Sequence, residues 1–284
     1  MKREPREALR AVRDRWPALA GLLLSLVLGP AAWGADPSQS WWRPVKDVSA
    51  EGHRAIWLFW YVTWLCIAAF GLVVIALVTF ALKYRARPGA RAFYDHGTNR
   101  QAFFVTLGAA VIVFVTIDMQ LVRYSQRDIK EFLFNWPTSA DTVRVEVMPQ
   151  QWAWNFRYPG PDGKFNTDDD VVTLNDLRVP VDKPVMLNLK AKDVIHSLYL
   201  PSLRIKHDAN PGYVTRMWFT AKESGKYEIA CSQMCGWAHY KMRGEMTVLA
   251  DADYQRWLKD AEADAQRRHD PADKDINWGW EWVQ

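Results

Sequence analysis

The sequence predicts a membrane protein in which a hairpin of two transmembrane helices is followed by an all-β sandwich domain with Greek-key connections. Two long apolar runs lie in its first half, and period-two alternation with turn residues begins at about Asp141. The 284 residues leave room for about one soluble domain of 100 to 150 residues beside the membrane segments. The formal charge of +4 gives no basic field, so we expect no nucleic-acid partner.

The N-terminus is typical of a secretory signal peptide, assigned to residues 1–34. Basic residues precede a short apolar stretch, Ala18 to Leu28, and small residues follow it. We predict cleavage after Gly34. The alternative is an uncleaved membrane anchor, although the stretch is shorter than the ~20 apolar residues that a span needs. In both cases residues 35–54 lie outside the cytoplasm.

The first span is predicted at residues 55–82 and the second at 102–122. Aromatic residues crowd the start of the first span, as at a membrane interface, and basic residues follow its end. The positive-inside rule therefore places the loop 83–101 in the cytoplasm. The second span returns the chain to the outer face, where a connector, 123–140, leads to the β domain. This topology suits a bacterial inner membrane with the domain in the periplasm.

The β domain is predicted at residues 141–250 as a small antiparallel sandwich. Such a sandwich brings loops that are distant in sequence together at one end, where function is often found. Its candidate strands are 142–158, 171–177, 185–190, 214–220, 226–230 and 245–249. The remainder, 251–284, is predicted as an amphipathic helix at 252–268 and an extended arm. The arm ends in Trp278, Trp280 and Trp282, which we expect to dock on a partner subunit or the bilayer.

The segment from Cys231 to Met242 carries the chemistry. Two cysteines, a histidine and a methionine within twelve residues form a soft ligand set that suits copper best. A blue-copper site uses one cysteine, so the second thiolate indicates a pair of copper ions with both thiolates as bridges. His239 and Met242 then supply one nitrogen ligand and one weak ligand. The other two are predicted to be His196 and the backbone carbonyl of Gln233.

Two other interpretations of these residues are open. Cys231 and Cys235 could close a small disulfide loop in an oxidising compartment. Two cysteines with two histidines could also bind structural zinc, although zinc gains nothing from a thioether and usually takes cysteines two apart. Both interpretations leave Met242 without a role.

Four motifs in order resemble the copper A domain of cytochrome c oxidase subunit II. They are Asp193–Ser197, Pro201–Lys206, Asp208–Gly212 and Cys231–Met242, and the resemblance covers about residues 50 to 250. It implies a cupredoxin fold and a dinuclear copper centre whose two ions share one unpaired electron when oxidised. It also implies cytochrome c as electron donor and a catalytic subunit I that reduces oxygen to water, with subunit III as a further partner. Haem and the second copper site then belong to the partner, because this chain offers no paired intramembrane histidines.

The resemblance also assigns a role to Trp152 in the stretch Gln151-Trp152-Ala153-Trp154. In the family an exposed tryptophan at this place receives the electron from the donor, which makes Trp152 the candidate. Without the resemblance, the alternation of Trp152, Trp154 and Phe156 predicts core packing for at least two of the three. The acidic turn 168–170 is expected to be solvated and to steer a basic donor towards the domain.

Two positions depart from the family pattern. Gln101 stands where the family commonly has a glutamate at the mouth of a proton path, and it cannot titrate. Gln233 stands where a glutamate often reaches an interface magnesium ion. The resemblance therefore does not extend to proton transfer at the first position or to magnesium at the second.

Other functions compatible with the same ligands keep the copper and change its use. The chain could be the copper A subunit of a nitric oxide reductase or another terminal reductase. It could also be a copper-binding assembly module, which would hold one labile copper and show no rapid electron transfer. Subunits of quinol oxidases lack these copper ligands, so they fit less well.

Overall fold

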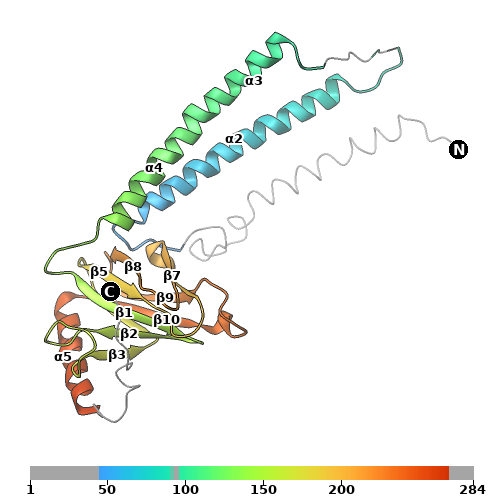
Figure 1. Cartoon of the computed structure of the whole chain (residues 1–284). Helices are drawn as coiled ribbons and strands as arrows, with labels where there is room; N and C mark the ends of the chain where they lie inside the picture. The colour runs from blue at the N-terminus through green and yellow to red at the C-terminus, as the bar shows by residue number, and fades with distance from the viewer. Residues whose placement is uncertain (1–44, 90, 92–95, 269–284) are drawn as a thin grey trace, which may run out of the picture. The chain divides into compact units, whose positions relative to one another are not determined.

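The computed structural model describes residues 45–89, 91 and 96–268, and Figure 1 shows the elements that they form. The predicted signal peptide at 1–34 and the tryptophan-rich arm lie outside the described residues. The two predicted parts of the protein, an apolar helical hairpin and a β-sandwich, are both present.

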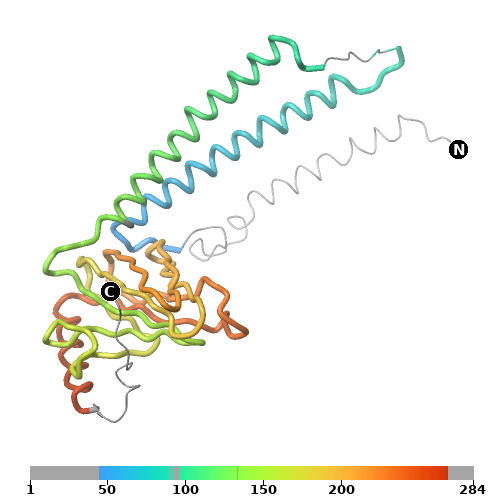
Figure 2. Tube along the Cα trace, viewed as in Figure 1, coloured from blue at the N-terminus to red at the C-terminus, as the bar shows by residue number. Residues whose placement is uncertain are grey.

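Two helices are long and apolar enough to cross a membrane. The first is α2, His53–Lys83; the second joins α3, Arg100–Val113, to α4, Met119–Ile129, through a π-helical turn. Figure 2 traces the two helices side by side. Trp57 packs against Tyr124 at 4.6 Å between ring centroids, and the Tyr61 hydroxyl donates to the Thr116 carbonyl at 2.9 Å. Their apolar side chains are otherwise exposed, as expected for helices that face lipid.

The second helix extends into the segment predicted as a connector. Helical structure continues through residues 123–134, which were expected to be the first two-thirds of a connector at 123–140. The reason is that α4 carries charged residues on part of its surface, so the helix can leave the hydrocarbon without unwinding. Its continuation, Lys130–Phe134, brings Glu131 to Arg54 at the start of α2, and this ion pair ties the two helices together.

Ten strands form two five-stranded sheets. The first sheet has the order β3-β2-β1-β5-β8, and the second has the order β4-β10-β9-β6-β7. Two pairs, β1 with β5 and β4 with β10, are parallel, so the expectation of a wholly antiparallel sandwich was wrong at these places. Such pairs arise where the chain crosses between sheets instead of turning back in a hairpin. The bounds are β1 Val143–Gln150, β2 Ala153–Tyr158, β3 Val171–Leu174, β4 Asp176–Pro180, β5 Pro184–Leu189, β6 His196–Leu200, β7 Ile205–Ala209, β8 Thr215–Thr220, β9 Gly225–Cys231 and β10 Arg243–Leu249.

Two predicted strands are each divided in the structure. Residues 142–158 form the hairpin of β1 and β2, which turns at Gln151 and Trp152 without glycine or proline. Residues 171–177 are divided at Asn175, whose positive φ of 55° redirects the chain from one sheet to the other. Asn175 bonds both sheets, because it accepts from the N–H of Trp154 at 2.8 Å and from that of Glu245 at 2.8 Å.

The core fills the space between the sheets, and α5, Asp251–Arg268, packs on β3 and β4. Tyr158 meets Trp257 of α5 at 5.2 Å between ring centroids. At the other end of the domain, Val48 is buried in the core, and its carbonyl accepts from the N–H of Lys222 just beyond β8. The rigid sandwich therefore holds the loops at its ends in fixed positions.

Candidate metal centre

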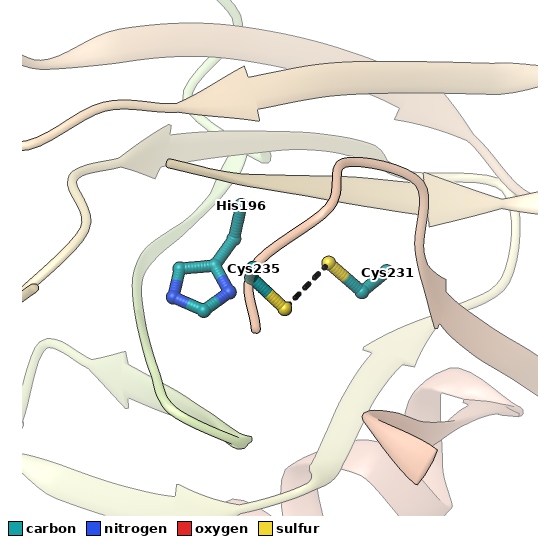
Figure 3. Close-up of side chains that lie close together, drawn as sticks. All are labelled: His196, Cys231 and Cys235. Atoms are coloured by element: carbon teal, nitrogen blue, oxygen red, sulfur yellow. Dashed lines mark hydrogen bonds between the residues drawn. The ribbon is translucent and has the colours of Figure 1, made fainter. Parts of the chain in front are cut away.

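The loop between β9 and β10 brings the predicted sulfur ligands together. Cys231 is the last residue of β9, and Cys235 is buried four residues later with its Sγ 3.7 Å from the Cys231 Sγ (Figure 3). Cys235 Sγ also lies 3.5 Å from His239 Nδ1 and 3.7 Å from Met242 Sδ. Cys235 is thus the centre of the cluster, with three other potential ligands in contact.

His196 reaches this cluster from β6. It is fully buried at the start of that strand, and β6 pairs with β9 so that Leu198 lies opposite Cys231. The Nε2 of His196 donates to Asp193 at 2.9 Å. Its Nδ1 has no hydrogen-bond partner in the described part of the chain, and in Figure 3 one ring nitrogen faces the two thiols. The potential ligand atoms of His196, Cys231 and Cys235 all lie within 4.8 Å of one another.

The two thiols differ in acidity. Burial raises the pKa of Cys235 to about 12, and the negative charge of a neighbouring Cys231 thiolate adds to the effect. Burial disfavours the Cys231 thiolate most, but hydrogen bonds with His196, the backbone of Ser197 and Gln233, and Cys235 together outweigh burial and lower the pKa of Cys231 to about 6. Cys231 is therefore ready to bind a metal at neutral pH, whereas Cys235 loses its proton when a metal binds.

The two weaker predicted ligands are also in place. The Met242 thioether is buried, which is uncommon for a loop residue unless it packs or ligates. The backbone carbonyl of Gln233 lies 3.2 Å from the Cys231 Sγ, while Gln233 itself is exposed. All six predicted ligand groups therefore converge on one small volume.

The donor set fits a pair of copper ions. Cys231 and Cys235 are free thiols, so this structure contains no disulfide between them. A zinc site of two cysteines and two histidines leaves the buried Met242 sulfur unused. The unpartnered, buried Nδ1 of His196 needs a partner, and a metal ion shared with the thiols supplies one. Two thiolates, two imidazoles and a thioether form a soft donor set that suits copper.

The turn between β1 and β2 holds the cysteine loop. The Gln151 side-chain amide and the Trp152 indole N–H both donate to the Cys235 carbonyl, at 2.8 and 3.2 Å. The backbone N–H of Gln151 donates at 2.6 Å to Asp193, the residue that fixes His196. The sequence alone indicates no role for Gln151 or Asp193. Their position beside Trp152 and His196 in the motifs is the only signal that could have found them.

Trp152 lies next to the centre and is half-buried, while Trp154 and Phe156 are fully buried in the core. Trp237 covers Trp152 on the outside, edge to face, with 5.3 Å between ring centroids. It is 75% exposed, and Met234 and Tyr240 of the same loop are also exposed. Trp237 was not predicted to belong to the site, although an apolar residue inside a polar ligand loop is a usable signal.

The acidic turn differs from expectation. Asp168 is exposed, but Asp170 is buried beside Arg157, with its Oδ2 3.5 Å from the Arg157 Nε. Asp170 therefore belongs to an interior ion network and does not contribute to a solvated acidic surface.

Comparison with known proteins gives relatives along most of the chain. An alternative cytochrome c oxidase subunit 2 from Bradyrhizobium diazoefficiens is 29% identical over 264 residues, which cover 85% of this chain and 91% of that protein. Cytochrome c oxidase subunit 2 from Cereibacter sphaeroides is 26% identical, covering 82% of this chain and 81% of that protein. Residues 143–248 match the family model for the periplasmic domain of cytochrome c oxidase subunit II.

Residues 143–248 belong to the cytochrome c oxidase subunit II family, and the relatives along most of the chain support a subunit II identity. A crystal structure of the periplasmic domain of subunit II of cytochrome oxidase from Bradyrhizobium japonicum is 25% identical and covers 45% of this chain and 97% of that domain, with a TM-score of 0.40. As a subunit II, this chain is part of an oxidoreductase complex, combining a copper-binding external domain with two apolar helices that fit a membrane protein.

Gly236 gives a test of how tightly the subunit II loop is packed. Its φ is +121°, and a Cβ there would lie 2.9 Å from Gln151 Nε2 and 3.1 Å from the Trp152 ring. We expect Gly236→Ala to lower the free energy of unfolding by about 1–3 kcal/mol, because it combines backbone strain with overpacking. Urea unfolding of the full chain in detergent measures this.

Gly212→Ala is the matched control for that experiment. Gly212 also has a positive φ, +89°, but a Cβ there meets nothing within 4 Å. Its substitution reports strain alone and is expected to cost less. Equal losses in the two variants would show that the contact between the loop and the Gln151–Trp152 turn is not tight.

Proposed function

We propose that this chain is the subunit of a respiratory cytochrome c oxidase in which electrons enter, one at a time, from cytochrome c. The observation that carries the proposal is the convergence of Cys231, Cys235, His239 and Met242 with the unpartnered Nδ1 of His196. In the proposed centre the thiolates of Cys231 and Cys235 would together hold two copper ions. His196 and His239 supply one nitrogen each, and the Met242 thioether and the Gln233 carbonyl are the weak ligands.

When bound, the copper pair supplies a one-electron carrier. The protein contributes a site that changes little between oxidation states. Cys235, Met242 and His196 are buried, which limits access of water, and Asp193 fixes the orientation of the His196 ring. His196 and Cys231 stand on paired strands of one sheet, so neither ligand can move far without breaking the sheet. A ligand shell that moves little is what rapid electron transfer requires.

The proposed path for the electron runs from the donor surface through Trp152. Its indole N–H bonds directly to the carbonyl of Cys235, which links the ring to a copper ligand. Trp237, packed edge to face against Trp152, widens the apolar surface that a donor meets. An exposed aromatic surface next to the site suits a transient contact with a small redox protein.

The partners follow from the same proposal. The electron passes to haem in a catalytic subunit I, which also holds the second copper site and reduces oxygen to water, and subunit III completes the complex. The relatives are named as cytochrome c oxidase subunits, which favours oxygen over nitric oxide as the final acceptor. The two apolar helices support a place in the bacterial inner membrane with the copper domain in the periplasm.

Replacing Trp152 by phenylalanine in the purified oxidase complex tests the path. Phe keeps a ring in the site but removes the hydrogen bond to the Cys235 carbonyl. We expect the rate of copper reduction by cytochrome c in stopped-flow experiments to fall about tenfold or more, equivalent to a barrier increase of about 1.4 kcal/mol. Copper content is expected to stay at the wild-type level.

Trp257→Phe is the control for this substitution, since Trp257 lies on α5 against Tyr158. This substitution makes the same chemical change outside the proposed path. The rate of copper reduction in this variant is expected to equal that of the wild type. If Trp152→Phe is reduced as fast as the wild type at full copper content, the electron does not pass through Trp152.

A further inference from the structure

A second site lies on the outer face of the first sheet, separate from the metal centre. The loop after β2 folds over strands β1, β2, β5 and β8 and encloses a cavity of about 540 Å³. Arg144 lies near the start of β1, whereas the turn beside the metal centre follows the end of that strand. Six residues of extended chain separate them, roughly 20 Å. The cavity is lined by Arg144, Glu146, Arg157, Gly163, Lys164, Phe165, Asn166, Met186, Asn188, Val214 and Arg216.

Positive charge dominates this cavity. One of its four basic residues, Arg157, is fully buried and bonds Glu146 at 2.9 Å, with Asp170 behind it. Arg157, Glu146 and Asp170 together carry one negative charge. The other three basic residues, Arg144, Lys164 and Arg216, leave the site with a surplus of about two positive charges.

The surplus charges are available to a ligand. Within the described chain, Arg216 and Lys164 have no ion-pair partner, and both are exposed at the rim. The guanidinium of Arg144 bonds the Gly163 carbonyl and lies over the Phe165 ring at 5.5 Å, so the loop is held over the cavity by the same residue that lines it. These contacts neutralise no charge on Arg144.

The interior of the cavity adds a polar group and an apolar wall. The Asn188 Oδ1 is buried and has no hydrogen-bond partner among the described residues, so this acceptor is free to take a hydrogen bond from a water molecule or from a hydroxyl group of a ligand. Met186 and Val214 provide the apolar wall. The guanidinium and ammonium groups around the cavity, and not the Asn188 oxygen, make it a suitable environment for a small anion.

We propose that this cavity binds a small anion that carries phosphate or carboxylate groups. Guanidinium groups pair with either group through two parallel hydrogen bonds, and Lys164 adds a point charge. The site is independent of copper, because none of its residues belongs to the metal centre.

The test is titration calorimetry on the full chain in detergent at constant ionic strength. The probes are pyrophosphate, inorganic phosphate and citrate, with sodium chloride as the reference for screening. We expect saturable binding of one anion per chain, and the order of pyrophosphate and citrate decides between phosphate and carboxylate as the preferred group. Arg216→Gln is expected to lower affinity about tenfold, because it removes one charge-assisted contact.

Lys259→Gln is the matched control, since Lys259 is exposed on α5 and does not line the cavity. It is expected to bind like the wild type. Arg216→Lys keeps the positive charge but loses the forked geometry of the guanidinium. Its affinity for the anion is expected to lie between those of the wild type and Arg216→Gln. Absence of saturable binding, or an equal loss in the Arg216→Gln and Lys259→Gln variants, overturns the proposal. Copper content measured on the same samples distinguishes a loss of anion binding from a loss of the metal centre.

Discussion

Replacing Cys235 by serine is expected to remove the two-copper centre and to lower cytochrome c oxidation by more than about a hundredfold, beyond the effect typical of outer-shell changes. Cys235 contacts three other ligands, Cys231, His239 and Met242, at 3.5 to 3.7 Å. A serine hydroxyl stays protonated and is a hard donor, so it cannot bridge two copper ions. Copper bound per chain is expected to fall from two ions to one or none.

Cys66→Ser is the matched control, because it makes the same chemical change away from the centre. Cys66 is an exposed residue of α2. Its copper content and activity are expected to equal those of the wild type. Two coppers per chain in the Cys235→Ser protein would show that the second thiolate is not a bridge. Metal analysis and the steady-state rate of cytochrome c oxidation, measured on the purified complex, give both readouts.

The second large effect is expected at Arg157. Its guanidinium is fully buried between Glu146 and Asp170, which are themselves buried. Replacement by alanine leaves two carboxylates in the interior without a cation and also opens a cavity. We expect the free energy of unfolding to fall by about 3–5 kcal/mol at pH 7.5. Urea unfolding of the full chain in detergent, followed by near-ultraviolet circular dichroism, measures the loss.

The loss is expected to depend on pH in a defined direction. Burial raises the pKa of Glu146 and of Asp170 even with Arg157 present. Both carboxyls therefore bind protons more readily in the folded state, so their contribution to stability is greatest at acidic pH and declines as pH rises through their folded pKa values. Without Arg157 this contribution declines more steeply with rising pH. The difference in the free energy of unfolding between the variant and the wild type should therefore shrink as the pH falls from 7.5 to 5.

Arg178→Ala provides the comparison for Arg157. Arg178 also pairs with a carboxylate, Asp176, at 2.9 Å, but both side chains are about one-third exposed. Its loss is expected to cost at most about 1 kcal/mol and to change little with pH. A loss of unfolding free energy in Arg157→Ala that is as small as the loss in Arg178→Ala would contradict the role given to the buried network. A loss that grows on acidification would contradict it as well.

The ligand set could be predicted from the sequence because most of its members lie within twelve residues. Soft ligands at short spacing leave few alternatives, and His196 was recognisable from its motif. The structure places all the predicted ligand groups in one cluster. The roles of Asp193 and Gln151 could not be predicted, because they depend on two hydrogen bonds between segments that are 42 and 84 residues apart.

The strand pattern was also harder to predict, because contacts between distant segments decide part of it. The β1–β2 turn contains none of the residues that usually mark a turn. The period-two alternation therefore continues across the turn and predicts one strand instead of two. Strand β6 begins at His196, whereas β7 mixes charged and apolar residues, and the pairing of the two strands is decided by the tertiary structure. The buried position of Asp170 likewise depends on Arg157, which no local pattern connects to it.

Cys231 and Cys235 are proposed to hold two copper ions. The direct measurement is copper analysis combined with electron paramagnetic resonance on the oxidised full chain in detergent, without its partner subunits. We predict two copper ions per chain and one unpaired electron shared by both nuclei. One copper ion per chain, with the spin confined to a single nucleus, would contradict the dinuclear centre and favour a copper-binding assembly module.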